Sequence, residues 1–162
     1  MNVELTEPEK AYITGLFDGE GHVSVLRTWC QPKYHRKRHI LYRLQLGIGN
    51  TNTEVLEWLV EKVGGKVYAV NWKAKGNRKL CWQWRYDGKK AEEFLKAIYP
   101  YSIIKRRQIE EALGFLGLGS EFVPAEREEY YHRFRELNRR GVGAYQPQPY
   151  NLEGSTESKK LQ

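Results

Sequence analysis

The sequence predicts a single α+β domain in the order helix, strand, strand, helix, strand, strand and then further helices. Three kinds of observation predict it: capping signals before apolar helical repeats, alternation of apolar and polar residues in two basic segments, and turn signals between them. A chain of 162 residues is long enough to bury one core. We expect one domain over residues 1–140 and an extended or disordered tail over residues 141–162, where Gly, Pro and Ser replace any apolar periodicity.

The first predicted helix begins at a capping box and ends in a run of glycines. Thr6 and Glu9 have the spacing of an N-cap residue and its reciprocal partner, so a helix is expected from residue 7 toward residue 21. Glycine inside a helix costs roughly 1 kcal/mol relative to alanine, and Gly15 and Gly19 lie four apart, on one helix face. The helix either packs closely on another element or lets two copies of the chain touch along this bare face.

Two carboxylates lie at the C-terminal end of this helix. Asp18 and Glu20 are unfavourable there by about 0.3 to 1 kcal/mol each, because the helix dipole is negative at that end. A divalent cation would offset this, since Mg²⁺ takes carboxylate oxygens as ligands. Two copies of the segment would bring paired carboxylates and carbonyls together, which suits metal-assisted phosphodiester hydrolysis. Structural or solvated acids are the alternative interpretation.

The strands are expected in two pairs. Residues 23–29 form the first strand and residues 43–49 the second, with a basic loop over residues 30–38. In the second strand Leu44, Leu46 and Ile48 alternate with polar residues and glycines, as in a half-buried strand. The other pair lies within residues 66–86 and turns at residues 75–78.

The later helices follow from capping and periodicity. Thr51 and Glu54 form a second capping-box pattern, which begins a helix that should end at Gly64-Gly65. The remaining helices are expected over residues 91–98, 103–118 and 124–140.

Positive charge concentrates in the two strand segments. The net charge is +7, but residues 22–53 and 66–86 carry +12 together and contain no acidic residue, which leaves −5 for the rest. A basic sheet face that also carries Gln and Asn suits the major groove of DNA, where Arg pairs with guanine and Gln or Asn with adenine. The predicted DNA-binding residues are Ser24, Leu26, Arg27, Thr28, Lys33, Arg36, Lys37, Arg38, Arg43, Gln45, Asn71, Lys73, Lys75, Arg78, Lys79, Gln83 and Arg85. An ordinary solvated strand face is the alternative for any one of them.

The segment Ile-Thr-Gly-Leu-Phe-Asp-Gly-Glu-Gly, residues 13–21, resembles the signature helix of the LAGLIDADG homing endonucleases. Glu20 stands where aspartate is common and Thr14 where alanine is usual. The motif occurs once, and a chain with one copy resembles the homodimeric members. Over roughly residues 6–118 the resemblance implies an antiparallel DNA-binding sheet and a dimer through the motif helix, with Gly15, Leu16, Asp18 and Gly19 at the contact.

The resemblance also implies the chemistry. It assigns catalytic roles to Glu20, to Asn50 with Asn52 as a weaker candidate, and to Lys105, and metal binding to Glu20 and Gly19. Asp18 is expected to be an end-of-helix hydrogen-bonding residue at the dimer contact, and His22 a strand residue, rather than ligands. The expected cofactor is Mg²⁺ or Mn²⁺, with Ca²⁺ binding without supporting cleavage. The implied reaction cuts both strands of a long, nearly palindromic DNA across the minor groove and promotes intron mobility.

Other functions of the same fold stay open. An intron maturase would bind structured RNA, a degenerate copy would regulate DNA without cutting it, and a dimerisation module would explain the glycines alone. The expected partners are double-stranded DNA, a second copy of the chain and intron RNA, with no membrane. Isolated Cys30 and Cys81 and the absence of a signal peptide or long apolar span indicate an intracellular protein, cytoplasmic or organellar and not secreted.

Overall fold

A computed structural model describes residues 5–30, 39–70, 80–87, 90–118 and 124–139. The elements are α1 (Glu7–Glu20), β1 (Gly21–Cys30), β2 (His39–Asn50), α2 (Thr53–Val63), β3 (Lys66–Val70), β4 (Cys81–Asp87), α3 (Lys90–Ile98), the 3₁₀ helix η1 (Tyr99–Tyr101), α4 (Arg106–Gly117) and α5 (Pro124–Leu137). The strands form one antiparallel sheet in the order β1-β2-β4-β3. The predicted α+β order of elements is confirmed. The tail over residues 141–162 lies outside the described residues.

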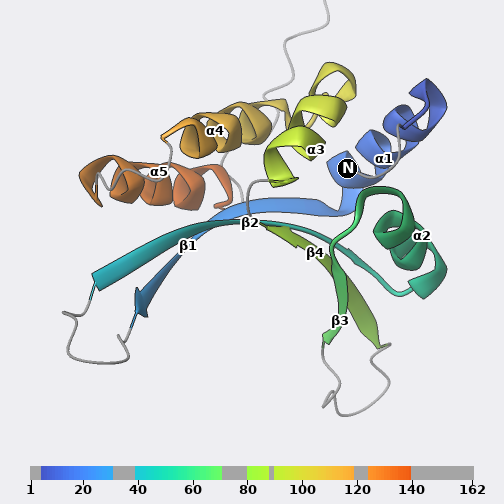
Figure 1. The fold of residues 1–162 in the computed structure, drawn as a ribbon, viewed down its shortest axis with the longest axis horizontal. Helices are drawn as coiled ribbons and strands as arrows, with labels where there is room; N and C mark the ends of the chain where they lie inside the picture. Colours follow the sequence, from blue (N-terminus) through green and yellow to red (C-terminus); the bar gives the residue numbers. More distant parts are fainter. Residues whose placement is uncertain (1–4, 31–38, 71–79, 88–89, 119–123, 140–162) are drawn as a thin grey trace, which may run out of the picture.

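The helices all lie on one side of the sheet. Figure 1 shows the sheet as an arch with α1 to α5 over its convex face, and no helix or strand of the described residues lies under its concave face. Successive residues of a strand point to opposite faces, so each strand gives alternate residues to the core and to the concave face. Within the described chain, no helix is long and apolar enough to cross a membrane.

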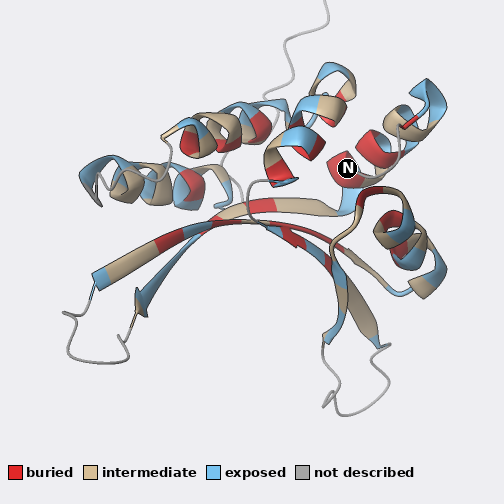
Figure 2. Cartoon of the chain, viewed as in Figure 1, coloured by how far each residue is buried: buried red, intermediate tan, exposed pale blue. Residues whose placement is uncertain are grey.

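The core lies between the convex face and the helices (Figure 2). Its centre is the Phe94 ring of α3, which makes edge-on or tilted contacts with Phe17, Trp84 and Tyr86 at centroid distances of 5.7, 5.4 and 5.8 Å. The indole nitrogen of Trp84 donates to the carbonyl of Gly64 at 2.8 Å, so the core indole has a polar partner. This packing fixes α1 and α3 against the middle of the sheet.

The ends of the helices show which sequence signals dominate. The predicted capping box of α1 is present, because the Thr6 hydroxyl and the Glu9 carboxylate each accept from the backbone of the other. The capping box predicted at Thr51 is wrong: Asn52 caps α2, and its side-chain oxygen accepts from the Glu54 amide at 2.8 Å. An asparagine directly before the helix supplies the same acceptor one residue later.

The start of α4 also differs from the prediction. The helix begins at Arg106 and not at residue 103. The amide groups of residues 103–105 donate to the Asp18 carboxylate of α1, so these residues form a turn around that side chain. The Asp18 carboxylate thus competes with the helix for these amide groups. It lies 85 residues before Ile103 in the sequence, so the local pattern of apolar residues could not predict this contact.

Candidate functional site

The C-terminal end of α1 meets the turn before α4 around the Asp18 side chain. One carboxylate oxygen accepts from the Ser102 hydroxyl at 2.6 Å and from the Lys105 amide at 3.1 Å. The other accepts from the amides of Ile103 at 2.7 Å and Ile104 at 3.1 Å. Asp18 is only 9% exposed, and its carboxylate therefore serves as the common acceptor for this turn.

This environment lowers the pKa of Asp18 below its ordinary value. Burial alone would raise the pKa, but the hydrogen bonds from Ser102 and from the three backbone amides lower it further than burial raises it. Each of these donors stabilises the ionised carboxylate. Asp18 is therefore charged at neutral pH.

Lys105 is held at the same place. Its ammonium donates to the backbone carbonyl of Asp18 at 3.0 Å. Burial lowers the pKa of Lys105 below its usual range, while the negative charges of Asp18 and Glu20 act in the opposite direction. Lys105, for which the resemblance implies a catalytic role, thus contacts α1 two residues before Glu20.

The other predicted residues of α1 occupy its outer face. Gly15, Gly19 and Glu20 are exposed, and Leu16 is half-buried. A Cβ added at Gly15 or Gly19 would meet nothing within 4 Å, so the glycines open onto space outside the chain. The Asp18 carboxylate, in contrast, points toward the turn before α4 of its own chain. The predicted dimer contact itself remains a prediction.

Asn50 and Asn52 form a hydrogen-bonded turn at the end of β2. The Asn50 side-chain oxygen accepts from the Asn52 amide at 2.9 Å, and Asn52 in turn caps α2. The turn uses one of the two acceptor sites of the Asn50 amide oxygen, so both the oxygen and the nitrogen of this side chain can contact a ligand.

The concave face gathers polar side chains from three strands. The strand register pairs Ser24 with Gln45 and Leu26 with Arg43, and all four alternate with residues of the core face. By register, seven predicted DNA-binding residues share this face: Ser24, Leu26, Thr28, Arg43, Gln45, Gln83 and Arg85. The nine predicted residues Lys33, Arg36, Lys37, Arg38, Asn71, Lys73, Lys75, Arg78 and Lys79 lie outside the described residues.

Arg27 lies on the other face of β1, which corrects its predicted position. Its guanidinium pairs with Glu128 of α5 at 2.5 Å and lies 4.9 Å from the centroid of the Tyr131 ring. The Tyr42 hydroxyl donates to the same glutamate. Arg27 lies two residues after Val25 and four after Val23, which are both buried, so it points to the same face of β1 as they do. The alternation of the strand could therefore have predicted this position.

Two polar residues of β3 and one of β1 were missed by the sequence reasoning. Lys66 pairs with Arg85 and Tyr68 with Gln83, which extends the concave face to the last strand. The Arg85 guanidinium lies 5.1 Å from the centroid of the Tyr68 ring. His22 also belongs to this face, since a Cβ at Gly47 would come within 2.2 Å of its imidazole. The alternation of Lys66 and Tyr68 in a short strand could have identified both.

His22 connects the concave face to the end of α1. Its Nε2 lies 3.5 Å from the amide nitrogen of Gln83. Burial lowers the pKa of His22 below its usual range, and the positive charges of Arg85 and Lys105 lower it further. Among the described residues, no group of three or more His, Cys, Asp or Glu side chains lies close enough to hold a metal ion within one chain.

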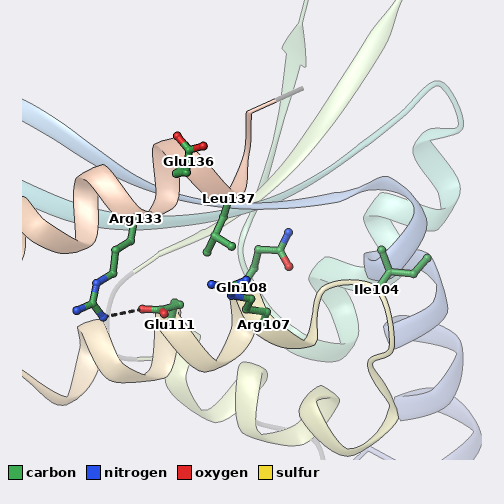
Figure 3. A pocket seen from close by; sticks show the side chains of 7 residues that line it. All are labelled: Ile104, Arg107, Gln108, Glu111, Arg133, Glu136 and Leu137. Atoms are coloured by element: carbon green, nitrogen blue, oxygen red, sulfur yellow. Dashed lines mark hydrogen bonds and ion pairs between the residues drawn. The ribbon is translucent and has the colours of Figure 1, made fainter. Parts of the chain in front are cut away.

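A separate hollow of about 820 Å³ lies between α4 and α5. Figure 3 shows Arg107, Glu111, Arg133 and Glu136 around it, with Glu111 and Arg133 paired at 3.3 Å. Of the residues around the Asp18 carboxylate, only Ile104 also lines this hollow. None of the predicted catalytic or DNA-binding residues lines it.

Acid should weaken the fold through Asp18. Because the pKa of Asp18 is lower in the folded chain, its contribution to stability is complete above its ordinary pKa of 3.8 and disappears as the pH falls through the lower folded value. We expect Asp18→Asn to lose less unfolding free energy than the wild type when the pH is lowered through this range. Urea unfolding at a series of pH values measures the unfolding free energy, with Glu92→Gln as the control, because this half-buried glutamate of α3 contacts only a surface lysine, Lys96, in the hydrogen bonds of the described residues. This prediction would be contradicted if the unfolding free energies of Asp18→Asn and of the wild type fall equally as the pH is lowered.

Comparison with known proteins rests on structure. No protein-family model matches the chain, and no curated protein matches its sequence significantly. The homing endonuclease I-CvuI, solved in complex with a DNA target, superposes with a TM-score of 0.64 at 19% identity, over 81% of this chain and 82% of that one. The archaeal intron-encoded homing endonuclease I-Vdi141I, complexed with DNA, gives a TM-score of 0.65 at 19% identity over 86% and 89%.

A longer protein shows the same likeness. The LAGLIDADG homing endonuclease I-LtrWI, bound to target DNA, has a TM-score of 0.58 at 15% identity, over 86% of this chain and 47% of that one. At these identities the likeness concerns the fold. Together with the motif at residues 13–21, it shows that the chain has the LAGLIDADG homing endonuclease fold.

Proposed function

We propose that this chain is a homing endonuclease that binds double-stranded DNA on its concave face and cuts both strands as a homodimer. The observation that carries the proposal is the position of Glu20 and Lys105 at the end of α1, where the chain continues directly into β1. An acid and a cation beside a polar, basic sheet face suit hydrolysis of a phosphodiester held on that face.

Glu20 and Gly19 offer the ligands that a hard divalent cation prefers. The Glu20 carboxylate is exposed, and backbone carbonyls end the helix beside it, so the donor set consists of oxygen atoms. One chain supplies a single exposed carboxylate here, and a second copy of Glu20 and the DNA phosphates would complete the shell. When bound, Mg²⁺ or Mn²⁺ would supply charge neutralisation at the phosphate and a more acidic water.

Lys105 would act on the substrate itself. Its ammonium is a fixed positive charge, held by the Asp18 carbonyl, and it would stabilise negative charge as it develops on the phosphate oxygens. Partial burial strengthens this interaction because water screens it less. The amide nitrogen of Asn50 would orient water or phosphate at the other side of the site.

Two chains are needed for cleavage of two strands. Each chain carries one motif and one exposed Glu20, and its outer α1 face presents bare backbone at Gly15 and Gly19. A symmetric pair joined through these faces would place two acids at the junction and extend the concave face into a longer groove. We therefore propose a long, nearly palindromic target and a genetic role in intron mobility.

The catalytic assignment predicts that Glu20→Gln abolishes cleavage while DNA binding remains. The substitution removes a charge that would hold the metal and leaves the concave face intact. Selection of cut duplexes from a randomised DNA library in Mg²⁺, Ca²⁺ or EDTA measures this for wild type and variant. Recovery of one partly palindromic site, cut only by wild type with Mg²⁺, supports the proposal. Retention of DNA or RNA without any cut would instead favour a regulator or an intron maturase.

The two faces of the sheet predict different outcomes for two arginines. Arg43→Ala should lower preference for particular bases by about 1 to 3 kcal/mol if it loses a bidentate contact. Arg27→Ala is the matched control, because Arg27 pairs with Glu128 on the helix side and should leave base preference unchanged. Competition binding with single-base variants of the selected site measures both. An equal loss for the two variants would argue against DNA binding on the concave face.

The dimer predicts that Gly15→Val produces a folded monomer. A branched side chain on the outer face of α1 would hold two copies of the helix apart, while the added Cβ meets nothing within 4 Å apart from its chain neighbours and the backbone of its own helix. Sedimentation velocity gives the mass, and circular dichroism verifies folding. A dimer that survives the substitution would place the contact elsewhere.

A further inference from the structure

We propose that Asp18 is a positioning residue for Lys105. Its carboxylate fixes the backbone of the turn before α4, and this turn holds the lysine ammonium beside Glu20. The inference rests on the proposed function, because the importance of Lys105 depends on DNA cleavage. It assigns to the first acid of the motif a role within one subunit.

The turn carries little packing of its own. The side chains of Ile103 and Ile104 are 85% and 69% exposed, so the residues just before Lys105 do not insert into the core. Their amide groups instead point inward and share the Asp18 carboxylate with the Lys105 amide. Side chains that face solvent cannot fix the backbone of this turn. The four hydrogen bonds to the buried Asp18 carboxylate fix it instead.

The position of Lys105 is determined at two points. Its amide donates to the Asp18 carboxylate at 3.1 Å, and its ammonium donates to the Asp18 carbonyl at 3.0 Å. Both contacts are to a residue that lies two positions before Glu20 on the same helix. A shift of the turn would therefore change the distance between the lysine charge and the acid.

The negative charge of Asp18 contributes a second effect. It raises the pKa of Lys105 against the lowering by burial, and so favours the protonated form. A lysine that stabilises a developing negative charge must be protonated.

Other roles for Asp18 fit the geometry less well. Both carboxylate oxygens accept hydrogen bonds from the turn, and the side chain is 9% exposed, so it is poorly available as a direct metal ligand. It also points away from the outer face of α1 that Gly15 and Gly19 form. A purely structural cap would stabilise the fold and leave the chemical step unaffected, and the experiment separates this case.

A double-mutant cycle tests the proposal. Asp18→Asn, Lys105→Ala and the double variant are compared by DNA affinity and by single-turnover cleavage of the selected site in Mg²⁺. We expect Lys105→Ala to slow cleavage by about 100-fold or more, and Asp18→Asn by at least about tenfold, both with unchanged DNA affinity. In a chain that already carries Lys105→Ala, Asp18→Asn should slow cleavage further by less than about twofold. The proposal would be overturned if the effects of the two substitutions on the cleavage rate multiply independently, or if Asp18→Asn leaves the cleavage rate unchanged.

A milder variant covers the case in which Asp18→Asn does not fold. Ser102→Ala removes one of the four hydrogen bonds and keeps the charge. It should slow cleavage only when Lys105 is present, and an equal effect in both backgrounds would overturn the proposal. Circular dichroism and thermal unfolding of each variant verify the fold.

A readout without cleavage separates this inference from the proposed function. Acylation of lysine amines, followed by peptide mass spectrometry, reports how well each amine is held. Asp18→Asn, or Ser102→Ala if the former is unfolded, should increase the labelling rate of Lys105 relative to exposed Lys96 several-fold. Unchanged labelling would overturn the inference, whereas increased labelling in a protein that cuts no DNA would leave the positioning intact and reject the endonuclease.

Discussion

One-sided covering of the sheet is the constraint on which the rest of the molecule depends. The α-helices of the described residues all lie on the convex face, so the strands that they cover place apolar residues toward them at alternate positions, and the positions between face the concave side. β2 shows this clearly, with Leu44, Leu46 and Ile48 buried between positions that face the concave side. An antiparallel sheet tolerates such exposure on one face. The uncovered face is therefore available for a ligand as broad as a nucleic acid.

Much of the fold could be predicted because its signals are local. Alternation located the strands, and a capping box located α1 to the residue. Errors arose where two local signals competed, as at Thr51 and Asn52, or where a distant group intervened, as at the start of α4. Arg27 shows a third cause: positive charge was read as a DNA contact without regard to strand parity.

The catalytic roles named from the sequence remain predictions, and what the structure adds is how the residues are connected. The ammonium of Lys105 contacts the Asp18 carbonyl at the end of α1, although 87 residues separate the two positions. The four hydrogen bonds to Asp18 depend on how η1 and the turn before α4 lie against α1, which no spacing in the sequence encodes. Asp18 is therefore buried within its own chain, while Gly15 and Gly19 of the same helix lie at the surface.

The way α5 closes over β1 has a consequence for self-association. β1 is an edge strand, and unpaired backbone groups at an edge can recruit a strand from another molecule. The Asn138 amide donates to the Val23 carbonyl at 2.7 Å, and Glu128 ties the same helix to Arg27 and Tyr42. One backbone acceptor of β1 is thereby used within its own chain, and the side chains of Arg27 and Tyr42 hold α5 against the strand. A strand from another molecule would have to displace these contacts in order to pair with β1.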